Sequence, residues 1–274
     1  MFKIIIMALL IFIGMVGYDS ITDKAQPTTP VQQEQQKISK HEKSAAMALF
    51  TSLLPPKEEW PSPVHKFYLA FNMDEVIDPI RQNPNWTNLD AMSRGIPQAL
   101  IAIEDHAFYN HGAIAVEGIL RAALANINAG EVVQGGSTLT QQFVKNVFLS
   151  HEQSMERKIE EAVLSLMLED NYSKDEILEL YLNTTYFGAG STGIKQASRT
   201  YFGKAPSALT LAEAAVIASL PYAPTGLNPL ENPEGCKKRQ LLVLAAMHKY
   251  GMINQGQLAE AKAEKIRLTN GTVM

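Results

Sequence analysis

Two adjacent carboxylates, Glu104 and Asp105, follow an apolar run at Ile96–Ile103. The run predicts one flank of a buried helix, so the two acids stand at the end of an apolar wall. Burial disfavours the charged form of a carboxyl group and raises its pKa toward the range of a general acid or base. A helix end that carries two solvated acids is the alternative interpretation of this run taken alone.

A glycine-rich turn, Gly135–Thr138, predicts the start of a second helix. The glycines give the backbone freedom, and Ser137 or Thr138 caps the helix, which leaves free N–H groups near its start. Such a terminus suits an anion such as a phosphate, although a plain helix cap is the commoner use of this turn. The helix continues with Gln141, Gln142, Lys145 and Asn146, and its lysine lies two turns after the cap on the same face.

A basic pair and an acid follow on a third predicted helix. Arg157 and Glu161 are four residues apart and are therefore neighbours on one helical face. The same row continues with Leu164 and Leu168, which are typical of a core. Polar groups on a core-facing row indicate a cleft; a surface ion pair of little energetic weight is the alternative.

Five segments, taken in order, resemble the five motifs of the peptidoglycan glycosyltransferases, glycosyltransferase family 51. They are Ile103–Gly112, Gly135–Gln142, Arg157–Glu161, Lys174–Asn183 and Arg239–Leu244. The likeness extends over roughly residues 96–253. This family occurs in bifunctional penicillin-binding proteins and in stand-alone transglycosylases. No Ser-x-x-Lys or Lys-Thr-Gly motif occurs in the sequence, so we expect the monofunctional type without a transpeptidase domain.

The resemblance implies polymerisation of lipid II into β-1,4-linked glycan strands, with inversion and release of undecaprenyl diphosphate. It makes Glu104 the base for the acceptor 4-hydroxyl. Glu161 would be the second catalytic acid, acting directly or through a divalent cation, Mg²⁺ or Mn²⁺; no organic cofactor is expected. The predicted substrate-binding residues are Asp105, Phe108, His111, Ser137, Thr138, Gln141, Gln142, Lys145, Asn146, Arg157, Lys158 and Arg239.

For several motif residues we expect a structural role rather than a role in catalysis. For His111, hydrogen bonds that hold its loop are favoured over proton transfer. The fourth motif is expected to be architectural at Lys174, Glu179, Tyr181 and Asn183, with Glu179 anchoring neighbouring backbone or a cation. The sequence departs from the family at Gln240, where a second arginine is usual, and at Ser191–Gly193, where an aromatic residue commonly precedes the glycine. Both departures affect how the substrate is bound rather than how it reacts.

The pattern from Pro97 onward is helical, with no alternating strand, which predicts a mainly α fold. Capping boxes at Ser173–Glu176, Thr210–Glu213 and Asn254–Gln257 mark helix starts, the last helix reaching Lys265. Another helix is expected at 234–250, with Gly251 as its C-cap residue. The segment 61–88 is expected to be irregular with one short strand or helix. The resemblance implies a lysozyme-like, two-lobed glycosyltransferase domain, placed at 61–268.

The N-terminus predicts a membrane anchor at residues 1–18, because Ile4–Val16 carries no charge. The run is shorter than the roughly 20 residues of a spanning helix, so a cleaved secretory signal is the alternative. Lys3 favours a single-pass protein of the cytoplasmic membrane, with the catalytic domain on its extracytoplasmic face. Residues 19–60 predict a flexible juxtamembrane linker that contains a helical pattern at Ser44–Leu54.

A net charge of −4 argues against nucleic acid as a partner, and the single Cys236 excludes an intramolecular disulfide. The expected partners are lipid II, the growing glycan strand, the membrane and other cell-wall synthases. The apolar segment Ile114–Asn128 is ordinary core or, as the resemblance implies, a jaw that dips into the membrane.

Two rival functions are a glycan hydrolase, which also uses paired carboxylates, and a catalytically inactive scaffold. The cations Lys145, Arg157 and Lys158 argue against the hydrolase, because an uncharged glycosidic bond has no diphosphate to neutralise. The presence of both predicted catalytic glutamates argues against the scaffold.

Overall fold

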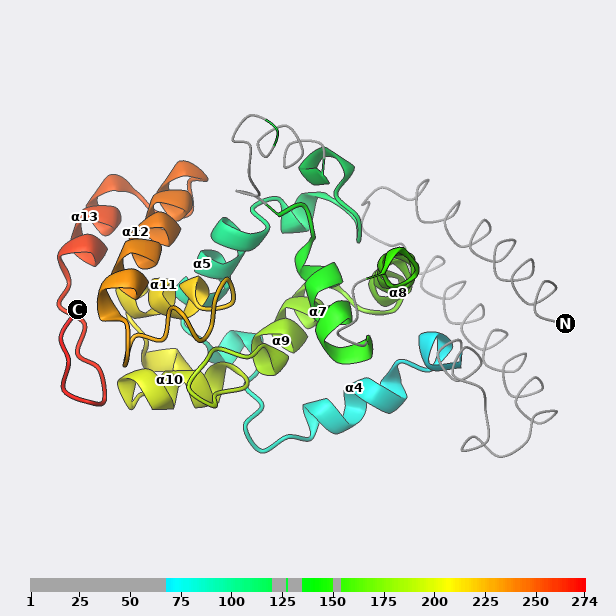
Figure 1. Ribbon diagram of the computed structural model, residues 1–274, viewed down its shortest axis with the longest axis horizontal. Coiled ribbons are helices and arrows are strands. Elements are labelled where there is room, and N and C mark those ends of the chain that lie inside the picture. Colours follow the sequence, from blue (N-terminus) through cyan, green and yellow to red (C-terminus); the bar gives the residue numbers. More distant parts are fainter. Residues whose placement is uncertain (1–67, 120–126, 128–134, 150–153) are drawn as a thin grey trace, which may run out of the picture. The chain divides into compact units, whose positions relative to one another are not determined.

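The computed structural model describes residues 68–119, 127, 135–149 and 154–274 (Figure 1). The chain divides into two compact units, Met1–Asp78 and Pro79–Met274, and the site residues belong to the second. The predicted anchor, linker and Ser44–Leu54 helix lie outside the described residues. Within the described part, no helix has the length and apolar character needed to cross a membrane.

The described residues are mainly helical, as the sequence predicts. The β-structure among them consists of two isolated bridges, Tyr186–Thr192 and Arg267–Val273. The α-helices are α4 (Asp74–Arg81), α5 (Gly95–Glu104), α7 (Leu139–Phe148), α8 (Met155–Asn171), α9 (Lys174–Thr184), α10 (Ile194–Phe202), α11 (Leu211–Ser219), α12 (Pro233–Lys249) and α13 (Gln255–Ala263). Short 3₁₀ turns are η2 (Leu89–Ala91), η3 (Phe108–Asn110) and η4 (Pro206–Ala208). Of the segment expected to be irregular with one short strand or helix, residues 68–88 are described, and they contain helical residues at 68–71 as well as the helix α4.

The helix starts follow the predicted capping chemistry. Ser173, Thr210 and Asn254 each accept a hydrogen bond from the backbone three residues ahead, and all three capping boxes are complete. Helix α12 ends at Lys249, and Gly251 adopts the left-handed conformation (φ +73°) that a C-cap glycine permits. Helix α13 ends two residues earlier than expected, because the chain turns extended at Glu264 and then pairs Ile266 with Met274.

The helices of the second unit pack in two groups. Helices α5, α11 and α12 contact one another, with α13 against α12, and α7 packs on both α8 and α9. Gly95 allows the close approach of α5 and α11, since a β-carbon there would lie 3.2 Å from the Cβ atom of Ala214. Residues 212–219 of α11 are all buried, most of them small. The first group thereby carries Glu104 and Arg239, and helices α7 and α8 of the second group carry Gln141, Gln142, Lys145, Asn146, Arg157, Lys158 and Glu161.

Candidate active site

Glu104 is the last residue of α5, at the end of the apolar wall that the sequence predicts. Its Oε2 atom accepts a hydrogen bond of 3.0 Å from Nε2 of Gln142 on α7. Burial raises the pKa of Glu104 above its ordinary value, although the Gln142 bond and the charges of Arg239 and Lys145 oppose the shift. The structure therefore joins the first, second and fifth motifs around one partly desolvated carboxylate.

Tyr181 on α9 fixes the orientation of the Gln142 amide. Its hydroxyl donates a hydrogen bond of 3.0 Å to Gln142 Oε1, which leaves the NH₂ group to face Glu104. Tyr181 was expected to be architectural, and its part in this chain of hydrogen bonds was missed. The signal available in the sequence is a tyrosine on a helix with buried leucines, since a buried phenolic hydroxyl needs a partner.

A pocket opens beside this hydrogen-bonded chain. Its lining residues are Gln142, Lys145, Asn146, Tyr181, Thr184, Thr185, Tyr186, Pro221 and Pro224. Three of them were predicted to bind substrate, and all three lie on α7. The threonine–tyrosine segment after α9 and the two prolines after α11 were not predicted, because they lie outside the motif residues taken to contact substrate.

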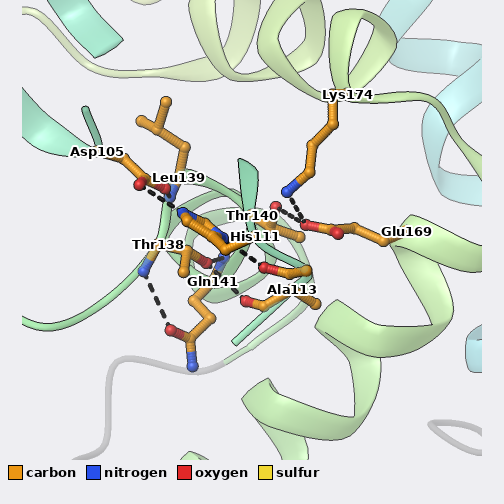
Figure 2. A network of polar contacts seen from close by, with 10 residues as sticks. Asp105, His111, Ala113, Thr138, Leu139, Thr140, Gln141, Glu169 and Lys174 are labelled. Carbon is orange, nitrogen blue, oxygen red and sulfur yellow. Dashed lines mark hydrogen bonds and ion pairs between the residues drawn. The ribbon is translucent and has the colours of Figure 1, made fainter. Parts of the chain in front are cut away.

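Asp105, directly after the base candidate, ties the end of α5 to the start of α7 (Figure 2). Its Oδ1 atom accepts a hydrogen bond of 2.6 Å from His111 Nε2, and Oδ2 accepts one of 3.0 Å from the backbone N–H of Leu139. His111 Nδ1 lies 2.6 Å from the carbonyl oxygen of Gly112. These are the loop-holding hydrogen bonds expected for this histidine.

The two acceptors around His111 favour its doubly protonated, charged form. Burial lowers the pKa of His111, but the hydrogen bonds to Asp105 and Gly112 outweigh burial and leave that pKa above its ordinary value. The charge of Lys174 opposes the increase. Protonated His111 therefore forms an ion pair with Asp105, and both side chains are largely shielded from solvent.

Thr138, rather than Ser137, caps α7. Its hydroxyl accepts from Gln141 N at 3.1 Å and donates to the carbonyl oxygen of Ala113 at 2.8 Å. The expectation of free N–H groups at this helix start was wrong for residues 139 and 141, because Asp105 and Thr138 already accept from them. A carboxylate of the chain thus occupies the place that the sequence analysis gave to a phosphate.

A second polar group in this region consists of Thr140, Glu169 and Lys174 (Figure 2). Glu169 Oε1 accepts hydrogen bonds from Thr140 Oγ1 at 2.5 Å and from Lys174 Nζ at 2.7 Å. The Lys174 ammonium also lies 4.4 Å from the ring centroid of Phe108. Phe108 is fully buried and Gln141 nearly so, which means that both serve the core and the helix cap here and offer no surface to a ligand.

The third motif forms a cluster at the N-terminal part of α8. Glu161 is only 2% exposed; Arg157 Nη1 lies 3.5 Å from its Oε2 atom, and Lys158 Nζ bonds its Oε1 atom. Lys158 also donates to the hydroxyl of Ser137 at 3.2 Å. The predicted helical neighbours therefore do lie on an inward-facing row, where the acid holds two cations next to the turn that precedes α7.

The residues around Glu161 do not fit a divalent cation held by the protein. Both of its carboxylate oxygens already face a positively charged side chain. Across the described part of the chain, no group of three or more His, Cys, Asp or Glu side chains is arranged to hold a metal ion. The chemistry of this cluster is accordingly that of two fixed cations.

Residues of the fourth and fifth motifs form hydrogen bonds that hold the backbone around the site. Glu179 accepts from the backbone N–H of Leu89 at 2.5 Å, and Asn183 exchanges hydrogen bonds of 2.9 Å with both backbone groups of Thr87, as an architectural role requires. Gln240, which replaces the usual second arginine, is fully buried and donates to the carbonyl oxygen of Ala212 at 2.9 Å. It is therefore a core residue of α12.

Comparisons with known proteins agree with these motifs. The family model described as Transglycosylase matches residues 73–248. A protein named "Putative transglycosylase" from Cupriavidus necator is 41% identical over 71% of this chain and 84% of its own length. Penicillin-binding protein 1A of Neisseria flavescens is 44% identical over 68% of this chain, and penicillin-binding protein 2D of Bacillus subtilis is 45% identical over 66%.

The chain spans only 23% and 26% of the lengths of those two penicillin-binding proteins. A crystal structure of penicillin-binding protein 1A from Haemophilus influenzae aligns with 48% of this chain and 16% of its own, at 33% identity and a TM-score of 0.34. The family match extends over more than half of the chain and includes all five motif segments. The chain belongs to the transglycosylase family and is a peptidoglycan glycosyltransferase.

Proposed function

We propose that this enzyme is a polymerase of lipid II, which builds β-1,4-linked glycan strands and releases undecaprenyl diphosphate. The observation that carries the proposal is the state of Glu104. This carboxylate is partly desolvated, is oriented by Gln142 and stands beside the charges of Lys145 and Arg239. A group of this kind can accept a proton from a sugar hydroxyl near neutral pH.

In the proposed mechanism, Glu104 takes the proton of the acceptor 4-hydroxyl while that oxygen attacks the anomeric carbon of the donor sugar. The bond from that carbon to the diphosphate breaks on the opposite face, so a single displacement turns an α linkage into a β linkage. Arg157 and Lys158 stabilise the negative charge that develops on the departing diphosphate. Glu161 keeps these two cations in place through its ion pairs with both.

The roles of Ser137 and Asn146 follow as parts of this proposal. Ser137 is exposed and bonded to Lys158, which suits a diphosphate contact, and Asn146 lines the pocket. Mg²⁺ or Mn²⁺ at Glu161 stays a prediction, and no step of the mechanism depends on it. Titration of the metal-free enzyme with each cation tests it: we expect turnover to persist in chelator because Arg157 and Lys158 already supply positive charge.

The substrate proposal includes a membrane location and a lysozyme-like, two-lobed fold. We propose that residues 1–18 anchor the chain and that the segment 114–128 meets the lipid surface. Of that segment, residues 114–119 and 127 are described, and Val116, Ile119 and Ile127 are 64%, 44% and 75% exposed. Exposed aliphatic side chains on one short segment support contact with lipid or with the lipid tail of the substrate.

The test is polymerisation by the full-length protein in detergent, with fluorescent lipid II and gel analysis of the product. Glu104→Gln should lower turnover by about 10²–10⁴-fold, the usual contribution of a general base. Its free energy of unfolding should change by less than about 1 kcal/mol, because the amide keeps the shape of the side chain. Glu260→Gln, at an exposed position of α13, is the matched control and should retain turnover.

Two results would contradict the proposal. Wild-type turnover in Glu104→Gln would remove this residue from the role of base. Cleavage of preformed glycan strands, without consumption of lipid II, would instead identify the hydrolase alternative.

A further inference from the structure

Arg239 on α12 is held by an aromatic ring. Its guanidinium carbon lies 4.1 Å from the ring centroid of Tyr222, which is the stacked arrangement of a cation–π contact. The Nε atom of Arg239 is buried and has no hydrogen-bond partner among the described residues. The ring face therefore contacts a guanidinium whose Nε atom has no hydrogen bond among the described residues.

Tyr222 stands at the edge of the pocket. It lies between Pro221 and Pro224, which both line the pocket, and its side chain is 66% exposed. Burial in a core consequently does not account for an aromatic residue at this place. The large exposed ring, in a turn next to the site, instead contacts the Arg239 guanidinium.

The charge of Arg239 reaches the candidate base. It is one of the two cations that oppose the burial-induced rise in the pKa of Glu104. The next residue on α12, Gln240, adds no charge here, because it is buried and bonded to Ala212. The position of the single guanidinium therefore decides how strongly this end of α12 acts on Glu104.

We propose that Tyr222 is a positioning residue, whose ring face holds the Arg239 guanidinium beside the pocket and within electrostatic reach of Glu104. The inference rests on the proposed role of Glu104 as the base. An arginine side chain has several freely rotating bonds, and without the ring the guanidinium gains access to solvent. The pKa of Glu104 then rises further, because one opposing positive charge has moved away.

The pH dependence of kcat/KM tests this directly, since it reports the ionisation of essential groups in the free enzyme. Tyr222→Leu keeps apolar bulk but removes the ring, and Tyr222→Phe keeps the ring without the hydroxyl. For the leucine variant we expect the acidic limb of the profile to move to higher pH and kcat/KM at neutral pH to fall about fivefold, or about 1 kcal/mol at 1.36 kcal/mol per tenfold. The phenylalanine variant should restore both quantities.

A double-mutant cycle isolates the contact. In an Arg239→Ala background, Tyr222→Leu should have no further effect on the acidic limb or on kcat/KM. Leu242→Ala, at an exposed position one turn further along α12, is the control for general damage to the helix and should match the wild type. Equal melting temperatures for all variants are expected, since the Tyr222 side chain is largely outside the core.

Three results distinguish the possibilities. An unshifted acidic limb in Tyr222→Leu, while Glu104→Gln is inactive, overturns this inference and leaves the proposed base intact. Additive effects of the two substitutions in the cycle also overturn it, since the ring would then act independently of Arg239. Turnover retained in Glu104→Gln refutes the proposed function itself, and the cycle still measures whether Tyr222 acts through Arg239.

Discussion

Replacing Asp105 by asparagine removes a charge from the junction between α5 and α7. The native carboxylate, with its side chain 8% exposed, accepts from the imidazole of His111 at 2.6 Å and from Leu139 N at 3.0 Å. An asparagine has the same shape but only one oxygen. It can therefore keep one of these two hydrogen bonds, and it presents an N–H donor to the other partner.

The cost follows from the two contacts. A hydrogen bond to a charged partner contributes about 1.5–3 kcal/mol, and a negative charge at a helix N-terminus adds roughly 0.3–1 kcal/mol. We expect Asp105→Asn to lower the free energy of unfolding by about 3 kcal/mol at pH 6. Both partners are well shielded from solvent, so salt should screen this loss only weakly.

The loss of stability caused by Asp105→Asn should depend on pH in a defined direction. The folded-state pKa of His111 is raised, so its charged form contributes stability that is fully present below the unfolded-state pKa of about 6.5 and is lost as the pH rises through the folded-state value. Above the folded-state pKa of His111, only the loss of the hydrogen bond at Leu139 should remain, at about 1 kcal/mol. The difference in the free energy of unfolding between wild type and variant therefore becomes smaller as the pH rises.

Urea unfolding of the full-length protein in detergent at pH 6, 7.5 and 9 measures this gap. His248→Gln is the control, because His248 is an exposed histidine on α12 and its loss should give no gap at any of the three pH values. A destabilisation by Asp105→Asn that is the same at pH 6 and pH 9 would refute the assignment of a charged His111. No destabilisation at all would refute the capping role.

Four further changes test other parts of the protein. Tyr181→Phe frees the Gln142 amide to rotate and should lower kcat by about three- to tenfold, the worth of one hydrogen bond of about 0.5–1.5 kcal/mol; single-turnover rates that match the wild type would contradict this. Arg157→Ala and Lys158→Ala should each slow turnover. Each should also weaken the binding of diphosphate-mimicking inhibitors of the moenomycin type by roughly 1.5–3 kcal/mol, measured by calorimetry. Unchanged inhibitor affinity in both variants would contradict the assignment of these residues to the diphosphate. Deletion of Met1–Ser20 should release the protein from membranes and leave activity on detergent-solubilised substrate, whereas a native N-terminus found near residue 20 would favour a cleaved signal.

The features that the sequence predicted correctly are those determined within a few residues. The capping boxes at Ser173, Thr210 and Asn254 join a side chain to a backbone group three residues away, so their chemistry can be recognised without a fold. The pairing of Arg157 with Glu161 follows in the same way from helical geometry. Local rules also predicted the end of α5, where the apolar run stops.

The features that the sequence could not predict join distant positions. Tyr181 and Gln142 are 39 residues apart, and they meet because α7 packs on α9. Asp105 and Leu139 are 34 residues apart, so the choice of a carboxylate over a phosphate at the start of α7 depended on tertiary structure. The helix start is closed by Thr138 and Asp105, which agrees with the plain helix cap that the sequence analysis gave as the commoner use of this turn.

The adjacent acids Glu104 and Asp105 differ because their surroundings differ. Glu104 has one neutral donor, Gln142, and its burial raises its pKa; the negative charge of Asp105 raises that pKa further. Asp105 has a charged donor and a helix terminus. The network of Figure 2 thus holds a fixed negative charge next to the base. Asp105→Asn should consequently lower the pKa of Glu104 and move the acidic limb of kcat/KM to lower pH, opposite to the shift expected for Tyr222→Leu. Two results would show that Asp105 acts only through the architecture of α7. One is an acidic limb of kcat/KM that moves to higher pH, and the other is an acidic limb that does not move although His111 has lost its charge.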